Sequence, residues 1–163
     1  GYYNNTTPGG AQGFKSSEPG AGWGYLYQWS AAMNGSTSER AQGVCPVGWH
    51  IPGDCEWKYL EHGLGMSVTD QNIVNQSVSR GTITATLMNS TGFAALYTGM
   101  REGNLRTFLF AHAGSTPSKG YWWTSTLLSS TSINNRSISS ALTGVVNANV
   151  HPRYCLSVRC LKD

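Results

Sequence analysis

The four cysteines fall in two widely separated pairs, and this placement constrains the fold more than any other feature of the sequence. Cys45 and Cys55 lie in the first part of the 163-residue chain, whereas Cys155 and Cys160 lie at its end. The spacing within each pair does not match a CxxC zinc site. An even number of cysteines instead favours disulfides formed in an oxidising compartment, with three possible pairings. Of these we favour the nested one, Cys45–Cys160 and Cys55–Cys155, which ties early segments to the last strand.

Length and charge indicate one domain over residues 1–163 that does not bind nucleic acid. The chain holds 163 residues, enough for a single hydrophobic core. A net charge of +3, with only 12% charged residues, gives no electrostatic footprint for nucleic acid. No apolar run approaches the length that a membrane-spanning helix needs. The 19 Ser, 15 Thr and 11 Asn are typical of an extracellular binding surface, or simply of a β-rich module.

Helix signals are concentrated in the first half of the chain. Residues 1–22 are rich in Gly, Asn, Thr and Pro, which predicts irregular structure with one short strand at most. Asp54 is a good N-cap and Gly63 a natural terminator, so a helix is expected between them. A second helix is expected over 70–78, with Ile73 and Val74 facing inward. Residues 81–88 fit either a strand or a turn.

Short strand signals follow, separated by Gly and Ser-Thr-Pro clusters. We expect strands over 93–96, 107–111 and 121–125, around Val145, and over 156–161. Helices early and strands late predict an α+β fold with long loops.

Five segments, in order along the chain, resemble a known family. They read LYQW and AAMNG within 26–35, CPVGWHIP over 45–52, GFAAL over 92–96, YWWTST over 121–126 and SVRCLKD over 157–163. The chain closely resembles the Fibrobacter succinogenes major paralogous domain, which is common in surface proteins of Bacteroidetes and looks like a variant of the C-type lectin fold. The resemblance implies a C-type lectin-like α+β fold: two helices, a twisted and mostly antiparallel sheet, long loops, and chain ends that meet in one sheet.

The resemblance also bears on the cysteines and on metal binding. Cys45 and Cys160 stand in family motifs, whereas Cys55 and Cys155 look like additions, which supports pairing the two additions with each other. Calcium-dependent lectins bind sugar through Glu-Pro-Asn or Gln-Pro-Asp and Trp-Asn-Asp sequences. The one Glu-Pro here is Glu18-Pro19, far too early, and no Trp-Asn-Asp occurs. With three Asp and five Glu in the chain, we expect no calcium, other metal or cofactor.

A gap in composition marks residues 124–158 as a candidate variable or ligand-binding region. This stretch contains no Lys, Glu, Gln, Met or Trp, although residues 1–123 contain 23 of them. Adenine-specific randomisation of Asn-type codons cannot produce these five residues, and bacterial diversity-generating retroelements diversify the C-terminal part of C-type lectin-like proteins in this way. Alternatively, a Ser/Thr-rich loop region simply lacks them.

A diversified segment must project its side chains from ordered loops into solvent, where an apolar patch signals an interaction surface. The predicted ligand-binding residues are Trp123, Leu127, Leu128, Ile133, Asn134, Arg136, Ile138, Leu142, Val146, Asn147, Asn149, His151, Arg153 and Tyr154. Three of these, Ile138, Leu142 and Val146, fit a core position equally well.

Nothing in the sequence favours an enzyme. No Gly-x-Ser-x-Gly, His-Glu-x-x-His or phosphate-binding loop occurs, and His50 is expected to be structural, bonded to a backbone carbonyl. We expect a non-enzymatic adhesin or receptor-binding domain of a bacterial surface or pilus protein, which binds a protein or glycan on another cell surface. The alternative is a structural surface module without a ligand of its own. Because the chain begins abruptly at Gly1 without a signal sequence, it is either mature or excised from a longer protein.

Overall fold

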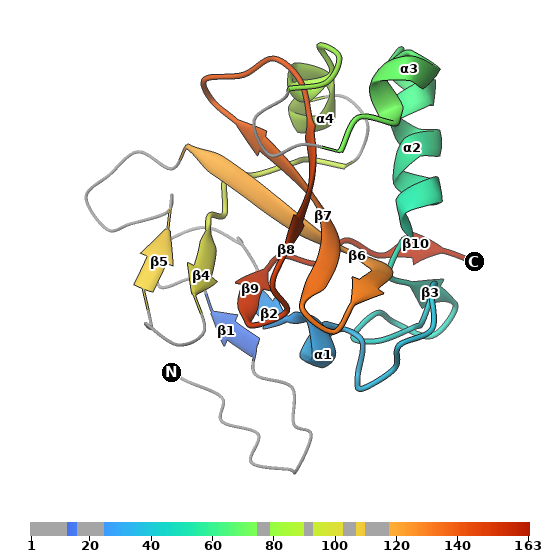
Figure 1. Cartoon of the computed structure of the whole chain (residues 1–163), viewed down its shortest axis with the longest axis vertical. Helices are drawn as coiled ribbons and strands as arrows, with labels where there is room; N and C mark the ends of the chain where they lie inside the picture. The colour runs from blue at the N-terminus through green and yellow to red at the C-terminus, as the bar shows by residue number, and fades with distance from the viewer. Residues whose placement is uncertain (1–12, 16–24, 75–78, 90–92, 103–106, 110–117) are drawn as a thin grey trace.

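The computed structural model describes residues 13–15, 25–74, 79–89, 93–102, 107–109 and 118–163 (Figure 1). The helices in these ranges are α1 (Trp29–Ala32), α2 (Asp54–Gly63), α3 (Val68–Gln71) and α4 (Thr84–Asn89). The strands are β1 (Gly13–Lys15), β2 (Tyr25–Gln28), β3 (Trp49–His50), β4 (Met100–Glu102), β5 (Thr107–Leu109), β6 (Lys119–Ser129), β7 (Ser132–Ser139), β8 (Val146–Val150), β9 (Tyr154–Leu156) and β10 (Leu161–Lys162). The predicted α+β class is therefore correct.

The strands form three sheets in which every strand pair is antiparallel. One sheet has the order β1-β2-β9-β4-β5, one consists of β6-β7-β8, and the third pairs β10 with β3. In Figure 1 the β6-β7-β8 sheet crosses the centre, with α2 on one side and the five-stranded sheet at the opposite lower edge. Early strands pair with the end of the chain, since Tyr27 lies opposite Leu156 and His50 opposite Leu161. The two ends of the described chain are thus bound to each other by backbone hydrogen bonds.

Helix α2 forms where the sequence predicts it, shifted by one residue at its start. Gly53, rather than Asp54, is the N-cap, and Asp54 is the first helical residue. The Gly53 amide donates to Glu56 Oε2 at 3.0 Å, which satisfies one of the amides that a helix start leaves unpaired. The carboxylates of Asp54 and Glu56 in the first turn also suit the helix dipole.

Several other predicted elements differ from the structure. Where a helix over 70–78 was predicted, the structure has a single turn, α3, which begins at Val68 because Ser67 Oγ accepts from the Asp70 amide. Val74 is 48% exposed instead of inward, and 75–78 lie outside the described residues. The ambiguous stretch 81–88 contains all of α4 except its last residue, Asn89, and 93–96 form no strand. Of the predicted irregular segment 1–22, the structure describes β1 alone.

The β6-β7-β8 sheet separates two hydrophobic clusters. Successive residues of a strand point to opposite faces, so Tyr121 and Trp123 of β6 join one cluster while Trp122 joins the other. The first cluster comprises Trp29, Ala32, Met33, Cys45, Ile51, Tyr121, Trp123, Ile133 and Leu156. The second, between the sheet and α2, comprises Trp57, Met66, Ile83, Leu87, Ala95, Trp122, Ile138 and Val145. Both clusters need the segment 121–156, so this segment is part of the core.

One of the two predicted disulfides forms. Cys45 and Cys160, 115 residues apart, are bonded to each other. The predicted Cys55–Cys155 bond is wrong: both are free thiols, Cys55 exposed on α2 and Cys155 buried on β9. Cys155 pairs with Gln28 on one side and Arg101 on the other in the five-stranded sheet, whereas Cys55 lies on α2, outside that sheet. Among the described residues, no helix has the length and apolar character to cross a membrane.

Candidate functional site

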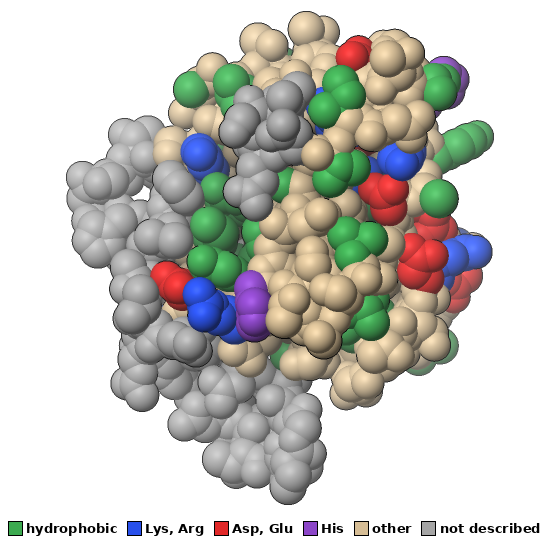
Figure 2. Space-filling model, in the orientation of Figure 1, with side chains coloured by type: hydrophobic (Ala, Val, Ile, Leu, Met, Phe, Trp, Pro, Cys, Tyr) green, Lys and Arg blue, Asp and Glu red, His purple; other side chains and the backbone are tan. Residues whose placement is uncertain are grey.

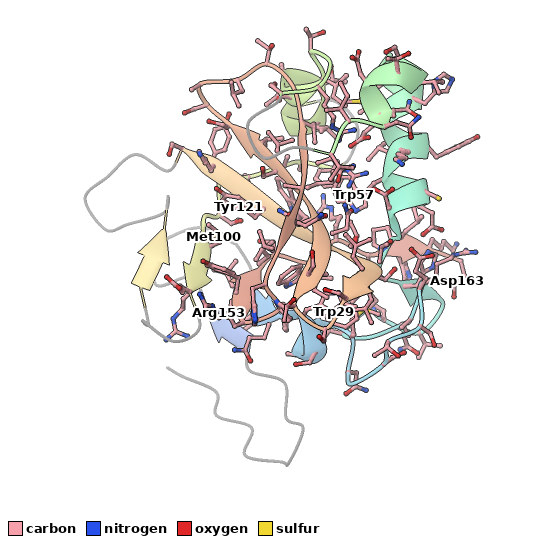
Figure 3. All side chains as sticks on the ribbon, in the orientation of Figure 1. Trp29, Trp57, Met100, Tyr121, Arg153 and Asp163 are labelled. Atoms are coloured by element: carbon pink, nitrogen blue, oxygen red, sulfur yellow. A yellow bond between two sulfur atoms is a disulfide. The ribbon has the colours of Figure 1, made fainter. Side chains whose placement is uncertain are left out.

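A buried polar network joins α2 to the β6-β7-β8 sheet. Glu61 Oε1 accepts from Arg136 Nε and from Arg80 Nη2, each at 2.7 Å, and all three side chains are almost fully buried. Arg136 Nη2 also donates to Asp54 Oδ1 at 2.6 Å. In Figure 3 the labelled Trp57 lies between α2 and the sheet, and Arg136 stands 5.9 Å from the centroid of its ring.

Two asparagines complete this network. Arg136 Nη1 donates to Asn134 Oδ1 and Asn147 Oδ1, both at 2.8 Å, and Asn134 Nδ2 donates to Asn147 Oδ1 at 2.7 Å. A buried guanidinium is tolerated when its donors are satisfied in this way. Asn134, Arg136 and Asn147 were predicted to contact a ligand from solvent-facing positions, but the structure buries them and pairs their polar atoms inside the protein.

Four further predicted ligand-binding residues are buried for packing reasons. Trp123 and Ile133 belong to the first hydrophobic cluster and Ile138 to the second, while Val146 is 7% exposed on β8. The indole of Trp123 donates to the Tyr27 carbonyl at 2.6 Å, which fixes the ring in the interior. Residues 124–158 were expected to carry free, solvent-facing side chains. That expectation is wrong for the residues of this segment that are buried on either face of the β6-β7-β8 sheet.

The remaining predicted residues reach solvent at two separate ends of the sheet. Leu127 and Leu128, near the β6–β7 turn, are 38% and 52% exposed. The register Leu127–Ile133–Val150 places the end of β8, followed by exposed His151 and Arg153, at this same end. Asn149 and Tyr154 are partly exposed there, and Leu142, which is 42% exposed, lies in the β7–β8 connection. The fourteen residues thus do not form one solvent-facing cluster.

The structure does show a pocket on the face of the sheet that points away from α2. It has a volume of about 250 Å³, and we call it the sheet-face pocket. Figure 3 labels Tyr121 and Met100 next to each other at β6 and β4, and Figure 2, in the same orientation, shows hydrophobic side chains at the surface there. The lining residues are Met100, Lys119, Tyr121, Asn135, Ser137, Ile138, Ser139, Leu142, Val146, Ala148 and Val150.

Asn135 is the unusual member of this pocket. Its side chain is 1% exposed, and its Oδ1 has no hydrogen-bond partner among the described residues. A buried polar atom without a partner costs about 1–3 kcal/mol, so each such atom in a native protein calls for an explanation. Nearby, burial raises the pKa of Tyr121 to about 12, which keeps its hydroxyl neutral. The pocket therefore offers neutral polar groups on an apolar sheet surface.

Sequence reasoning missed most of these residues, although one signal was present. Val146, Ala148 and Val150 alternate with Asn147 and Asn149, which is the period of a strand with two different faces. That pattern would have separated the pocket face from the network face.

His50 was predicted to bond to a backbone carbonyl, but its partners are acidic side chains. His50 Nδ1 lies 2.5 Å from Asp163 Oδ1 and His50 Nε2 lies 3.0 Å from Glu56 Oε1, so its partners are carboxylates. This cluster links β3, α2 and the end of the chain. No group of three or more His, Cys, Asp or Glu within the described ranges is placed to hold a metal ion.

Taken together, the antiparallel sheets and short helices, the long-range disulfide and the pocket on the central sheet define a small α+β domain stabilised by its own C-terminal segment. Residues 2–162 match the Fibrobacter succinogenes major domain, so the chain belongs to this family. Comparison with the curated proteins and with the solved structures found no match.

Proposed function

We propose that the protein is a non-enzymatic ligand-binding domain whose ligand occupies the sheet-face pocket. The observation that carries this proposal is the buried, unpartnered Oδ1 of Asn135 in the wall of the pocket. A ligand donor, such as a sugar hydroxyl or a peptide amide, would supply the missing hydrogen bond. Ligand pockets combine apolar walls with a few polar groups of this kind.

The chemistry of the walls favours an uncharged ligand. Ser137 and Ser139 line the pocket beside Asn135, and Val146 and Ala148 supply apolar surface. Lys119 is the one charged residue among the described lining residues. A glycan, or a protein loop with hydroxyl and amide groups, fits this surface. Such a ligand agrees with an adhesin or receptor-binding role at a bacterial cell surface, on another cell's protein or glycan.

A structural surface module without a ligand is the second candidate function. The burial of Asn134, Arg136, Ile138 and Asn147 favours it, because these parts of the C-terminal segment hold the fold together. The two candidates predict different results for the same substitution.

Asn135→Leu separates them. Because Asn135 Oδ1 makes no hydrogen bond within the described structure, removing it should leave the free energy of unfolding unchanged or raise it. Ligand binding should fall sharply, since the pocket loses its acceptor. The test is to array the purified chain and this variant against host glycans and cell-surface proteins, with unfolding in urea measured in parallel.

The matched control is the triple variant Leu127→Ala, Leu128→Ala, Arg153→Ala, which changes exposed residues outside the pocket. Binding retained in the triple variant and lost in Asn135→Leu supports the pocket. Binding that Asn135→Leu leaves intact and the triple variant abolishes places the ligand at the exposed end of the sheet instead. If neither the native chain nor any variant captures a ligand, the result favours the structural module.

We also propose that the fold is a variant of the C-type lectin fold. The antiparallel pairing of β2 with β9 and of β3 with β10 supports this, because it joins the two ends of the domain as that fold requires. A surface location agrees with the Cys45–Cys160 disulfide, since such bonds persist in oxidising compartments.

A further inference from the structure

The strand register shows which side chains adjoin one another in the sheet-face pocket. Asn135, in the central strand β7, lies opposite Ala148 of β8, and Ser137, two residues further along β7, lies opposite Val146. Residues directly opposite each other share a face of the sheet, and so do residues two apart on one strand. All four line the pocket. The pocket therefore has polar side chains along β7 next to apolar side chains along β8.

The Oδ1 atom of Asn135 is an acceptor that needs a donor. The Asn135 side chain is 1% exposed, and its Oδ1 has no hydrogen-bond partner among the described residues. An amide oxygen accepts and does not donate, so only an N–H or O–H group satisfies it. Because Asn135 is so deeply buried, the donor must belong to a small group at the tip of a ligand rather than to the bulk of that ligand.

The neighbours of Asn135 limit which donor fits. Ala148 lies directly across from it, and Val146 and Val150 line the pocket on the same face of β8. An ammonium or guanidinium group would lose its hydration against these apolar walls, at a large cost in free energy. A hydroxyl would supply the donor but no apolar surface. An acetamido group supplies both, because it carries one N–H and one methyl group.

The size of the pocket favours a group of this kind. The volume of the pocket is about 250 Å³, whereas pockets that enclose a whole small-molecule ligand measure about 300–1,000 Å³. The pocket thus suits one substituent, with the rest of the ligand at its rim. Ser137 lines the pocket on the same face as Asn135, and its hydroxyl is a donor for the carbonyl oxygen of an acetamido group.

The position of the pocket favours a sugar over a peptide as the carrier of the acetamido group. A common mode of peptide binding adds a strand to a free sheet edge. Strand β7 is central and pairs with both β6 and β8, so it offers no free edge. Binding in the pocket depends instead on side-chain hydroxyl and amide groups beside apolar surface, and such groups match the hydroxyls of a sugar.

We propose that the sheet-face pocket binds the acetamido group of an N-acetylated sugar. The acetamido N–H donates to Asn135 Oδ1, the acetamido carbonyl accepts from the Ser137 hydroxyl, and the methyl group packs on Ala148 and Val146. This inference rests on the proposed ligand-binding function, because it names the class of ligand for the same pocket. It adds one requirement: a sugar with a hydroxyl in place of the acetamido group should bind more weakly.

Matched pairs of methyl glycosides test this requirement. N-acetylglucosamine and N-acetylgalactosamine are compared with glucose and galactose, which carry a hydroxyl at the same carbon. Nuclear magnetic resonance follows the side-chain amide signal of Asn135 in the native chain, and Asn135→Leu identifies this signal by removing it. We expect at least one acetamido sugar to shift the signal and to bind about tenfold more tightly than its hydroxyl counterpart, which lacks the amide hydrogen bonds and the buried methyl group.

Two variants test the residues of the pocket. Asn135→Leu should weaken binding of the acetamido sugar about tenfold or more, because the acceptor is lost. Ala148→Leu keeps Asn135 and should weaken binding to a similar degree, because the larger side chain occupies the space of the methyl group. Tyr59→Leu, at an 83% exposed position of α2 outside the pocket, is the matched control and should bind as the native chain does.

Urea unfolding establishes that each variant is folded, and if a pocket variant is not, the comparison of glycosides on the native chain decides. The inference is overturned if no acetamido sugar shifts the Asn135 signal, or if the hydroxyl sugars bind equally tightly. It is also overturned if both folded pocket variants bind like Tyr59→Leu, or if an N-acetylated dipeptide binds more tightly than every sugar.

Failure of this inference is distinguishable from failure of the proposed function. The ligand captured on the glycan and protein array reports on the pocket whatever its chemistry. If Asn135→Leu loses that ligand while the acetamido sugars bind no better than their hydroxyl counterparts, the pocket remains the binding site and only the acetamido inference fails. If Asn135→Leu retains that ligand, the pocket is not the binding site, and both fail together.

Discussion

The Arg136 guanidinium and the Glu61 carboxylate meet at 2.7 Å, with both side chains almost completely withdrawn from water. One partner comes from the middle of β7 and the other from the third turn of α2, so this contact fixes how the helix lies on the central sheet. Glu61 also pairs with Arg80, which makes one carboxylate the counter-ion of two buried guanidinium groups. Removing Glu61 would leave both guanidinium groups without this carboxylate.

Glu61→Gln should therefore be strongly destabilising. It leaves two buried cations without their charge partner, and breaking a buried pair in this way costs about 3–5 kcal/mol. The free energy of unfolding in urea, followed by tryptophan fluorescence, measures the loss. Glu102→Gln is the control, because Glu102 pairs with the exposed Arg153 at 3.2 Å and such a pair is worth about 1 kcal/mol or less. Equal losses in the two variants would contradict a central role for Glu61.

Asp54 should make the free energy of unfolding decrease at acid pH. Burial by itself would raise the pKa of this carboxyl, but Arg136 and Lys58 outweigh burial and lower the pKa below its ordinary value. A carboxyl with a lowered folded-state pKa contributes stability that is present above the unfolded pKa of about 3.9 and is lost as pH falls through the folded value.

The free energy of unfolding should thus decrease between about pH 5 and pH 2. Asp54→Asn should be less stable than the native chain near neutral pH and should show a smaller decrease over that range. Urea unfolding of both proteins at several pH values tests this. An identical decrease in native and variant protein would mean that Asp54 is not the group responsible.

How much was predictable from the sequence differs between the two halves of the chain. Helix α2 was predicted nearly to the residue because its signals are local: acidic residues at the start, a glycine at the end, and Trp57 and Leu60 at helical spacing. The Cys45–Cys160 bond agrees with the favoured pairing. The predicted Cys55–Cys155 bond does not form, because Cys55 lies on α2 and Cys155 lies on β9. The tertiary fold keeps these two elements apart, and no local pattern in the sequence shows that separation.

The C-terminal segment was misinterpreted because its core is polar. Asn134, Arg136 and Asn147 look like surface residues in a sequence, and only the approach of Glu61 and Asp54 from α2 turns them into an interior network. No local pattern encodes a partner 75 residues away. Conversely, Asn135 resembles its neighbours in the sequence, yet its place opposite Trp123 and Ala148 puts it on the other face, in the pocket.

The two free cysteines should differ in reactivity. Cys55 is exposed, whereas Cys155 is buried and has a pKa raised by burial to about 11, although Arg101 opposes this shift. Because the thiolate is the reactive form, a chromogenic disulfide reagent at mildly alkaline pH should modify Cys55 quickly and Cys155 only after unfolding. Native protein should release one equivalent of chromophore and denatured, unreduced protein two. Cys55→Ser should release none while native. Denatured protein without any reactive thiol would instead indicate a second disulfide.

Gly144 should tolerate no larger side chain, because two carbonyl groups stand where a Cβ would be. An added Cβ would lie 2.3 Å from both the Arg80 and Gly81 carbonyl oxygens. These backbone atoms cannot rotate away, and the next residue, Val145, exchanges two hydrogen bonds with Arg80 that anchor the start of β8. Gly144→Ala should therefore lower the free energy of unfolding by about 1–3 kcal/mol or more.

Gly63→Ala is the matched control for this substitution. A Cβ at Gly63 meets nothing within 4 Å, and alanine favours the last turn of α2. Its unfolding free energy in urea should be unchanged or slightly higher than that of the native chain.

Gly144 and Glu61 should be coupled through Arg80. The Arg80 side chain donates to Glu61, so a Gly144→Ala substitution that displaces the Arg80 backbone should also disturb the buried ion pairs. The double variant Gly144→Ala, Glu61→Gln should then lose less than the two single losses added together. Strictly additive losses would show that the two contacts act independently.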